Sequence, residues 1–480
     1  MIPEPTTIPI TLLLASADPS SGFALFNSYA FLLVFLPLTI LGHRLALRFA
    51  GGRAAVAVLV LASLTFYGSW TPTGQWSPNF LIGLLASMAF NFTLGRALAA
   101  RAHKDRARAL LALGVAVTLA HLGWFKYVTF IHQLISVPIV HHFEMLPQFR
   151  ENQHNRAWKP SSMDLSIGLT LLSFGLFKKV IIADEMAALA TPIFNQAESG
   201  AEPYTPVAWT GALAYTFQIY FDFSAYSDMA TGVARLFGIK LPTNFFSPYN
   251  ARSIVDFWRR WHITLSRFLR DYLYIPLGGN RKGPARRYVN LAITMLLGGL
   301  WHGAAWTFVF WGALHGLYLC INHAWSALAK KWTERPGAKA NPSRFGSALY
   351  TAACWGVTML AVVVAWVFFR APTFEGARAM LQSMFAFNLF NDADIDWTLP
   401  TDPRTTGITL AAGVLISLAP PNGLQLLGRF NPTIDWSQRA NQRPWCKWSP
   451  DWFWAILAAL LFAISFLHLS RPSEFIYWQF

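Results

Sequence analysis

Two histidines with contrasting surroundings are the residues of this sequence best suited to chemistry. His262 lies in a basic, tryptophan-rich segment, and His302 lies forty residues later inside a long apolar run. A titratable side chain is costly to keep at membrane depth, and a neutral imidazole suits general-base work because its pKa lies near neutral pH. The pair therefore predicts proton transfer. The alternative for His302 is a hydrogen-bonding role between helices.

The segment around His262 has the apolar spacing of an amphipathic helix. Over Ile254–Tyr272, aromatic and aliphatic residues recur every three or four positions beside a polar stripe. We expect this helix in the cytoplasmic headgroup layer, where its arginines either anchor on anionic lipid or receive a phosphorylated donor. The following turn, Leu277–Gly283, adds backbone N–H groups and two cations that suit phosphate. The candidate donor-binding residues are Arg259, Arg260, Ser266, Arg270, Asn280, Arg281 and Lys282.

A second set of side chains could line a substrate cavity. Acidic groups in apolar runs should pair with arginines or face a polar cavity. We expect pairing for Asp228 and leave both options open for Asp222. His315 follows His302 by thirteen residues, about 140° around a continuous helix, so we expect it to point elsewhere and keep it only as a secondary candidate. The candidate cavity residues are Asp222, Ser224, Tyr226, Trp301, Trp306 and His315.

Several common catalytic patterns are absent from the sequence. It contains no GxSxG elbow, HExxH, P-loop or Rossmann glycine fingerprint, which disfavours a covalent serine enzyme, a metalloprotease or an NTPase. His141, His142 and Glu144 have no third ligand at a recognisable spacing, so we expect a polar loop there and no metal site. The three cysteines have neither disulfide-framework nor metal spacing, and we expect them to be packing residues.

The composition indicates a membrane protein. Of 480 residues, 54% are apolar and only 13% are charged, which is too apolar for a water-soluble domain. The net charge of +15 comes from Lys and Arg in short loops, the bias of cytoplasmic loops, so it does not indicate a nucleic-acid partner. We therefore expect an all-α polytopic membrane protein.

The apolar runs and the loop charges predict a topology. Runs of spanning length cover residues 31–49, 54–70, 80–98, 110–130, 165–182, 207–223, 348–369 and 452–469, with a shorter run at 408–418. With the double-length run Tyr288–Leu328, they give roughly ten to eleven crossings, together with interfacial and re-entrant helices. Tyr288–Leu328 is about twice the spanning length, so it should enter and return, with His302 on the inward limb. We expect residues 1–25 to form a poorly structured leader and 26–480 a single membrane domain. The acidic stretch Asn391–Asp402 and the amino terminus should face outside, and the basic loops should be cytoplasmic: His43–Arg53, Arg96–Arg108, Arg252–Arg287 and Lys330–Arg344.

The chain also resembles the membrane-bound O-acyltransferase family, and within it the AlgI-like alginate O-acetyltransferase branch. The resemblance extends from near one end of the chain to the other. The stretches that carry it are Phe26–Thr39, Pro138–Phe149, Gly175–Asp184, Phe217–Tyr249, Asp256–Gly283, Gly298–Gly316 and Glu474–Phe480. Two of them contain the motifs WRRWH, which ends at His262, and WHG, which contains His302.

The resemblance implies a funnel of helices in the bacterial inner membrane. Acetyl-coenzyme A would be the donor on the cytoplasmic side, and no cofactor would be permanently bound. His302 would be the general base or help to load the acyl group, and His262 would orient it or hold the thioester. A periplasmic partner of the SGNH-hydrolase type would pass acetyl to an exported polysaccharide such as alginate, cellulose or peptidoglycan.

The sequence departs from the family at one place. Family members usually carry several dozen further residues, with a stretch like PLGISFFTFQ, where this chain passes from WFKYVTFIH, which ends at His132, straight to Gln133. Two other classes of protein therefore stay open. One is a transporter or flippase in which His302 and Asp222 relay protons. The other is an inactive scaffold that holds partner proteins.

Overall fold

The structure is a computed structural model of the chain. It describes residues 26–68, parts of 85–96, and residues 142–154, 160–200, 202–303, 305–333, 344–387, 401–438 and 446–469. Several expectations lie wholly or largely outside these ranges: the leader 1–25, the loop Arg96–Arg108, the crossing Leu110–Phe130, the departure near Ile131–Gln133, the loop Lys330–Arg344, the acidic stretch Asn391–Asp402 and the carboxyl-terminal stretch Glu474–Phe480.

The described residues are helical and contain no strand, which confirms the all-α prediction. Within the described ranges, three stretches are π-helical, Phe31–Phe35, Lys178–Ala183 and Arg270–Tyr274, and three are single 3₁₀ turns, Pro248–Asn250, Gly428–Phe430 and Trp436–Gln438. The α-helices are α2 (Leu36–Phe49), α3 (Gly52–Gly68), α6 (His142–His154), α7 (Ser162–Phe177), α8 (Asp184–Glu198), α9 (Thr205–Leu236), α10 (Ile254–Trp258), α11 (Ile263–Leu269), α12 (Gly283–His302), α13 (Trp306–Thr333), α14 (Arg344–Arg370), α15 (Phe374–Phe385), α16 (Pro403–Leu418), α17 (Gly423–Leu426) and α18 (Trp452–Leu467).

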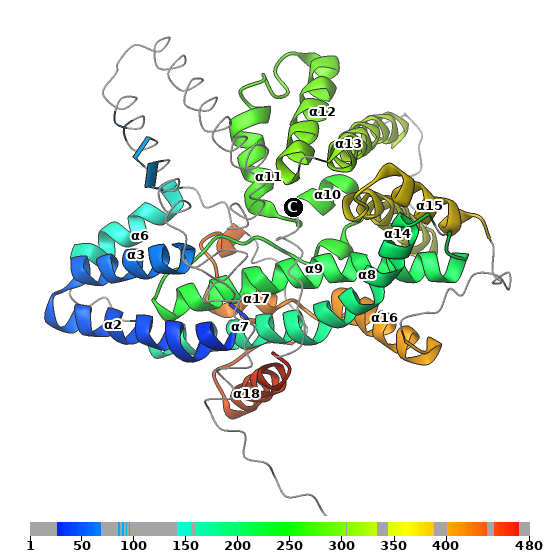
Figure 1. The fold of residues 1–480 in the computed structure, drawn as a ribbon. Coiled ribbons are helices and arrows are strands. Elements are labelled where there is room, and N and C mark those ends of the chain that lie inside the picture. The colour runs from blue at the N-terminus through cyan, green and yellow to red at the C-terminus, as the bar shows by residue number, and fades with distance from the viewer. Residues whose placement is uncertain are drawn as a thin grey trace, which may run out of the picture.

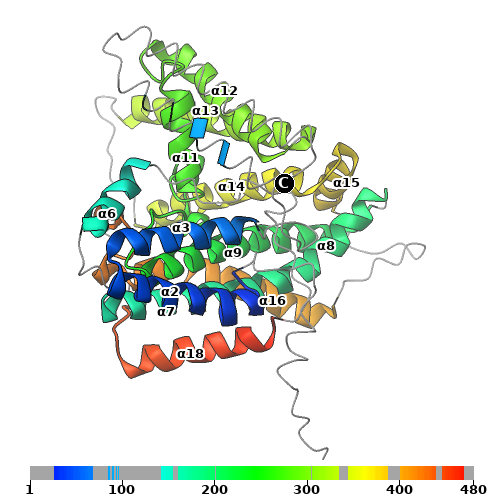
Figure 2. The same cartoon turned by 60° about the vertical axis from the view of Figure 1, so that its left-hand side comes forward.

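Helix α9 forms the centre of the fold. Of its 32 residues, 26 are buried, and α7 and α8 pack along it in the middle of the molecule (Figure 1). Small residues make the α7 contact close: a Cβ on Gly168 would lie 2.8 Å from the Gly232 carbonyl oxygen, and a Cβ on Gly175 would lie 2.8 Å from that of Ala225. Close backbone approach of this kind is typical of membrane helices. Several helices, among them α3, α9 and α18, run roughly parallel (Figure 2).

Three of the described helical stretches are long and apolar enough to cross a membrane: Phe31–Phe49, Ser162–Glu198 and Gly346–Arg370. Shorter apolar helices cover Gly52–Phe66 and Trp452–Leu467. Large apolar side chains on these helices face outward, which suits contact with lipid; Val357 is 70% exposed and Leu38 is 62% exposed. The number of crossings stays a prediction.

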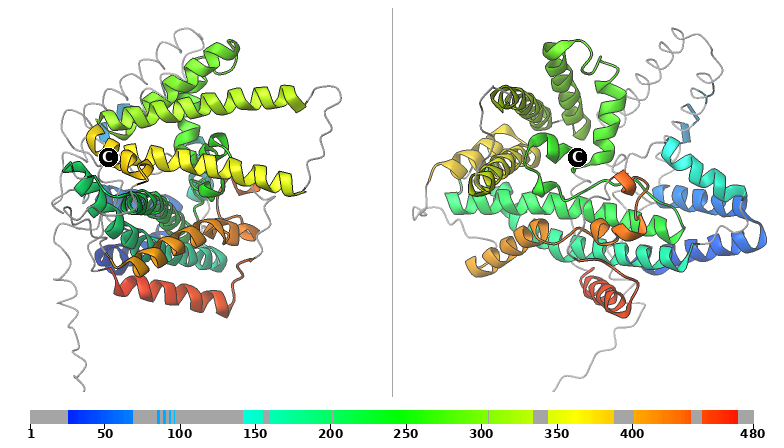
Figure 3. Two further views of the ribbon diagram at one scale, coloured as in Figure 1. Left: turned by 90° about the vertical axis from the view of Figure 1, so that its right-hand side faces the viewer. Right: turned by 180° about the vertical axis from the view of Figure 1, so that it is seen from behind.

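The double-length apolar run folds back on itself as a helical hairpin, as predicted, whereas its entry into the membrane stays a prediction. Helix α12 ends at His302, Gly303 is extended, and α13 begins at Trp306. The two helices pack against each other, and α13 also lies along α14 (Figure 3, left).

Two local expectations are wrong. Ile254–Tyr272 is not one amphipathic helix, because a break at His262, whose φ is 40°, separates α10 from α11. The predicted polar loop at His142 is instead the start of α6. Glu144 in α6 forms an ion pair with Arg267 at 3.0 Å, so this carboxylate neutralises a cation.

Candidate active site

His262 is held at the break between α10 and α11 by a buried polar network. Its side chain is 2% exposed, and its Nδ1 lies 3.0 Å from the Asn244 Oδ1. The same oxygen accepts a hydrogen bond from the Thr264 hydroxyl at 2.9 Å, and the Asn244 Nδ2 donates to the Ser227 Oγ at 3.0 Å. Since the Asn244 oxygen is an acceptor, the imidazole proton sits on Nδ1 and the basic lone pair on Nε2.

Burial also determines the charge of His262. The Phe223 ring meets the imidazole edge to face, with centroids 4.7 Å apart. Burial lowers the pKa of His262 to about 3, because a charged imidazole is poorly solvated there. The ring is therefore neutral at physiological pH, and so low a pKa suits a positioning role better than proton abstraction, which needs a pKa near the operating pH.

His302 is the last residue of α12 and lies in an aromatic cage. Its side chain is 5% exposed. Its ring centroid lies 5.0 Å from Trp301, 5.1 Å from Trp311 and 5.0 Å from Phe369. The Trp301 ring is also 6.4 Å from that of His262. The structure therefore places the two histidines of the sequence prediction around one indole, although they come from separate elements.

His315 lies closer to His302 than a continuous helix would allow. The expectation that it points elsewhere is wrong, because the chain breaks at Gly303 and α13 returns beside α12. The Trp311 ring contacts both imidazoles, at 5.1 Å from His302 and 4.9 Å from His315. The Nδ1 of His315 accepts a hydrogen bond from the Trp258 indole at 3.3 Å. No described residue hydrogen-bonds to its Nε2.

A basic pocket lies between the α10–α11 segment and the α12–α13 hairpin. It holds about 470 Å³. Arginine side chains and apolar walls line it, with no carboxylate among the lining residues: Val255, Trp258, Arg259, Ser266, Leu269, Arg270, Tyr274, Asn280, Arg287, Leu291, Thr294, Met295, Leu319 and His323. Arg270 pairs with Asp271 at 2.7 Å, whereas Arg259 and Arg287 form no ion pair with a described residue. The pocket therefore attracts anions.

The basic pocket connects to the histidines through Trp258. This indole lines the pocket, donates to His315, and lies 5.9 Å from the Trp311 ring, which contacts His302. A short chain of aromatic contacts therefore leads from the arginines to His302.

The structure separates the predicted donor-binding residues. Arg259, Ser266, Arg270 and Asn280 line the basic pocket. Arg260, adjacent to Arg259 in sequence, instead lines a different cavity, because the end of α10 turns the two side chains to different faces. The remaining two, Arg281 and Lys282, are exposed on the following turn and do not line the pocket.

The structure also separates the predicted cavity residues. Trp301 contacts both site histidines, but Trp306 is 76% exposed at the start of α13. Tyr226 packs on Phe26 with ring centroids 5.1 Å apart. Ser224 is buried, and no described residue hydrogen-bonds to its hydroxyl. Assignment of these side chains to a substrate cavity stays a prediction.

The two acidic residues of α9 are paired with lysines, whereas we expected arginines. Asp222 is 1% exposed and lies 2.8 Å from the Lys179 Nζ, which also contacts Asp184 at 2.8 Å. Asp228 lies 2.8 Å from the Lys178 Nζ. Breaking such buried pairs is costly because it leaves an unpaired charge, so these pairs hold α9 to the chain after α7.

Sequence reasoning missed several site residues. Asn244 fixes His262, yet no spacing rule links it to a histidine eighteen residues later. Asn244 lies in the stretch Phe217–Tyr249, whose resemblance to the family was a signal for it. For the partners of Asp222 and Asp228, the signal was the presence of Lys178 and Lys179 within an apolar run. Arg287 lines the basic pocket but was not predicted to do so, because it belongs to α12 and lies outside the turn expected to bind phosphate.

The helices and the buried histidines beside a basic pocket define a polytopic membrane protein with a site suited to transfer chemistry. The sequence model of the membrane-bound O-acyltransferase family (MBOAT) matches residues 107–364, which is more than half of the chain. The chain belongs to this family and is a membrane O-acyltransferase.

Curated relatives agree with this assignment. The peptidoglycan O-acetyltransferase of Helicobacter pylori is 38% identical over 76% of this chain and 65% of its own length. The probable alginate O-acetylase AlgI of Pseudomonas putida is 34% identical over 95% of this chain and 100% of its own. A teichoic acid D-alanyltransferase of Streptococcus thermophilus is 33% identical over 44% of this chain and 52% of its own.

Proposed function

We propose that this O-acyltransferase moves acetyl from acetyl-coenzyme A, on the cytoplasmic side of the inner membrane, toward an exported polysaccharide or peptidoglycan. A periplasmic partner of the SGNH-hydrolase type would complete the transfer. The acceptor class rests on the similarity to the alginate O-acetylase and the peptidoglycan O-acetyltransferase. The donor rests on the basic pocket and its aromatic path to His302.

The basic pocket suits a phosphorylated thioester. Arg259, Arg270 and Arg287 offer charge-assisted hydrogen bonds to the phosphates of coenzyme A. The apolar wall of Trp258, Leu291 and Met295 suits the uncharged arm that carries the acetyl group. Trp258 is the wall residue whose contacts continue to His315 and Trp311, so the thioester would lie at that end of the pocket. This juxtaposition is the observation that carries the proposal.

The proposed reaction balances without a metal or redox partner. The acceptor hydroxyl oxygen attacks the thioester carbonyl carbon, the C–S bond breaks, and an acetyl ester and free coenzyme A result. His302 takes the hydroxyl proton as the oxygen attacks and returns a proton to the departing sulfur. His262, with its proton fixed on Nδ1 by Asn244, orients the reacting groups through Nε2.

The first test measures transfer of radiolabelled acetyl from acetyl-coenzyme A by the purified protein with its periplasmic partner. We expect His302→Ala to lower turnover by ~10²–10⁴, the usual cost of losing a general base. His468→Ala serves as a matched control, because that imidazole contacts the Ile464 carbonyl near the end of α18.

Two outcomes would contradict the proposal. Turnover by a folded His302→Ala protein within about twofold of the parent chain would remove His302 from the base role. Acetyl-coenzyme A left intact by the parent chain, with the partner and acceptor present, would exclude acetyl as the transferred group. That second result is also what the transporter and scaffold alternatives predict.

A further inference from the structure

A second cavity lies on another face of α10, between this helix and the amino-terminal part of α14. It holds about 970 Å³, and we call it the α14 cavity. Asp256 and Arg260 face it, whereas Val255, Trp258 and Arg259 face the basic pocket. Its other polar lining includes Asn250, Arg252, Ser347 and Thr351.

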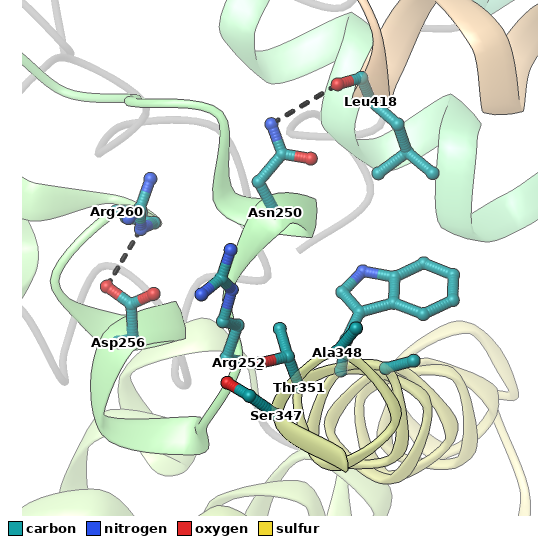
Figure 4. Close-up of a pocket in the computed structure, with 10 residues that line it drawn as sticks. Asn250, Arg252, Asp256, Arg260, Ser347, Ala348, Thr351 and Leu418 are labelled. Carbon is teal, nitrogen blue, oxygen red and sulfur yellow. Dashed lines mark hydrogen bonds and ion pairs between the residues drawn. The ribbon is translucent and has the colours of Figure 1, made fainter. Parts of the chain in front are cut away.

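The α14 cavity carries an uncompensated positive charge. Arg260 pairs with Asp256 at 2.8 Å, so these two charges balance. Arg252 is exposed and forms neither a hydrogen bond nor an ion pair with any described residue. Figure 4 shows its guanidinium in the cavity, between the Asp256–Arg260 pair and the hydroxyl-bearing residues Ser347 and Thr351 of α14. A cation beside two hydroxyl groups suits a phosphate.

The position of the α14 cavity suggests where that phosphate comes from. Gly346–Arg370 is one of the stretches able to span a membrane, and the cavity lies against its amino-terminal end. On the same helix, Leu349 is 61% exposed and Val357 is 70% exposed. An anionic head in the cavity would therefore have an apolar helix surface alongside for its acyl chains. This amphiphilic arrangement fits a phospholipid better than a soluble nucleotide.

We propose that the α14 cavity binds the phosphodiester headgroup of an anionic phospholipid, with Arg252 as its principal contact. The neighbouring arginines of the WRRWH motif then serve different cavities: Arg259 faces the basic pocket and Arg260 helps to wall the lipid site. The phosphates of coenzyme A share this chemistry, so the test must separate the two sources. The lipid inference does not depend on the proposed acetyl donor.

The test measures two ligands on the full chain. Binding of phosphatidylglycerol relative to phosphatidylcholine is measured by native mass spectrometry, and binding of coenzyme A by equilibrium dialysis. We expect Arg252→Gln to lower the preference for phosphatidylglycerol about fivefold, the usual effect of one cation at a membrane surface. Arg252→Lys should retain most of this preference, since it keeps the charge. Arg259→Gln is the matched control, and it should weaken coenzyme A binding without changing lipid preference.

Two results would overturn the proposal. One is a phosphatidylglycerol preference that is equal in the parent chain and in Arg252→Gln. The other is a loss of coenzyme A binding in Arg252→Gln as large as that in Arg259→Gln with lipid preference unchanged, because the cavity would then belong to the donor. A failure of coenzyme A to bind any variant would count against the donor proposal alone.

Discussion

At the scale of single residues, a hydrogen bond determines what His262 can do. An imidazole is a base only at the nitrogen that lacks a proton, and the Asn244 oxygen holds the proton on Nδ1. Because Asn244 also accepts from Thr264 and donates to Ser227, its own orientation is fixed. The WRRWH motif was enough to select His262, but its partners come from α9 and from the loop after it, which only the folded chain brings together.

Replacing Asn244 should therefore damage catalysis more than substrate binding. Asn244→Ala leaves the His262 N–H and the Thr264 hydroxyl buried without their acceptor, which costs about 1–3 kcal/mol for each such group. We expect kcat to fall at least tenfold with a smaller change in KM for acetyl-coenzyme A, measured by steady-state acetyl transfer. A loss confined to KM would instead show that Asn244 acts on donor binding.

At the scale of elements, the α12–α13 hairpin brings His302 and His315 to the same indole. Two glycines allow the helices to approach: a Cβ on Gly299 would lie 2.3 Å from the Phe308 carbonyl oxygen, and one on Gly312 would lie 2.3 Å from that of Met295. Gly312 directly follows Trp311, so this contact fixes the ring that touches both imidazoles.

A methyl group at Gly312 should force the hairpin apart. Overpacking of a close contact costs typically about 1–3 kcal/mol, so we expect Gly312→Ala to lower both the melting temperature in detergent and the acetyl-transfer rate. Gly356→Ala is the matched control in α14, since its Cβ would meet nothing within 4 Å. A melting temperature and rate for Gly312→Ala equal to those of Gly356→Ala would show that the close packing is not needed.

The elements also show where sequence reasoning stops. Long apolar runs predicted α7, α9, the α12–α13 hairpin and α14, because length and hydropathy alone identify such helices. The break at His262 and the two faces of α10 could not be predicted, because the segment keeps helical spacing through a residue with φ of 40°. Because of that break, His262 is buried in the core, and Arg259 and Arg260 line separate cavities.

At the scale of the whole molecule, loop charges and geometry give a consistent topology. The α14 cavity brings together Arg252, Ser347 at the start of α14 and Leu418 at the end of α16, so these three chain positions lie on one side. The first two border loops predicted to be cytoplasmic from their basic charge. Helix α16 begins at Pro403, just after the acidic stretch Asn391–Asp402 that was expected outside. If α16 crosses the membrane, Leu418 at its end lies on the cytoplasmic side with Arg252 and Ser347, and the acidic stretch before Pro403 lies outside.

Cysteine labelling in cells tests this orientation. In a chain whose native cysteines, Cys320, Cys354 and Cys446, are replaced by serine, we introduce Ala285→Cys at the start of α12 or Glu375→Cys at the start of α15; both positions are exposed. Positive-inside bias places residue 285 in a basic cytoplasmic loop, and α14 then carries residue 375 to the other side. We expect a membrane-impermeant maleimide to label residue 375 in intact spheroplasts and residue 285 only after permeabilisation. Labelling of both from outside would show that the basic loops do not set the orientation, and the donor pocket could not then face cytoplasmic acetyl-coenzyme A.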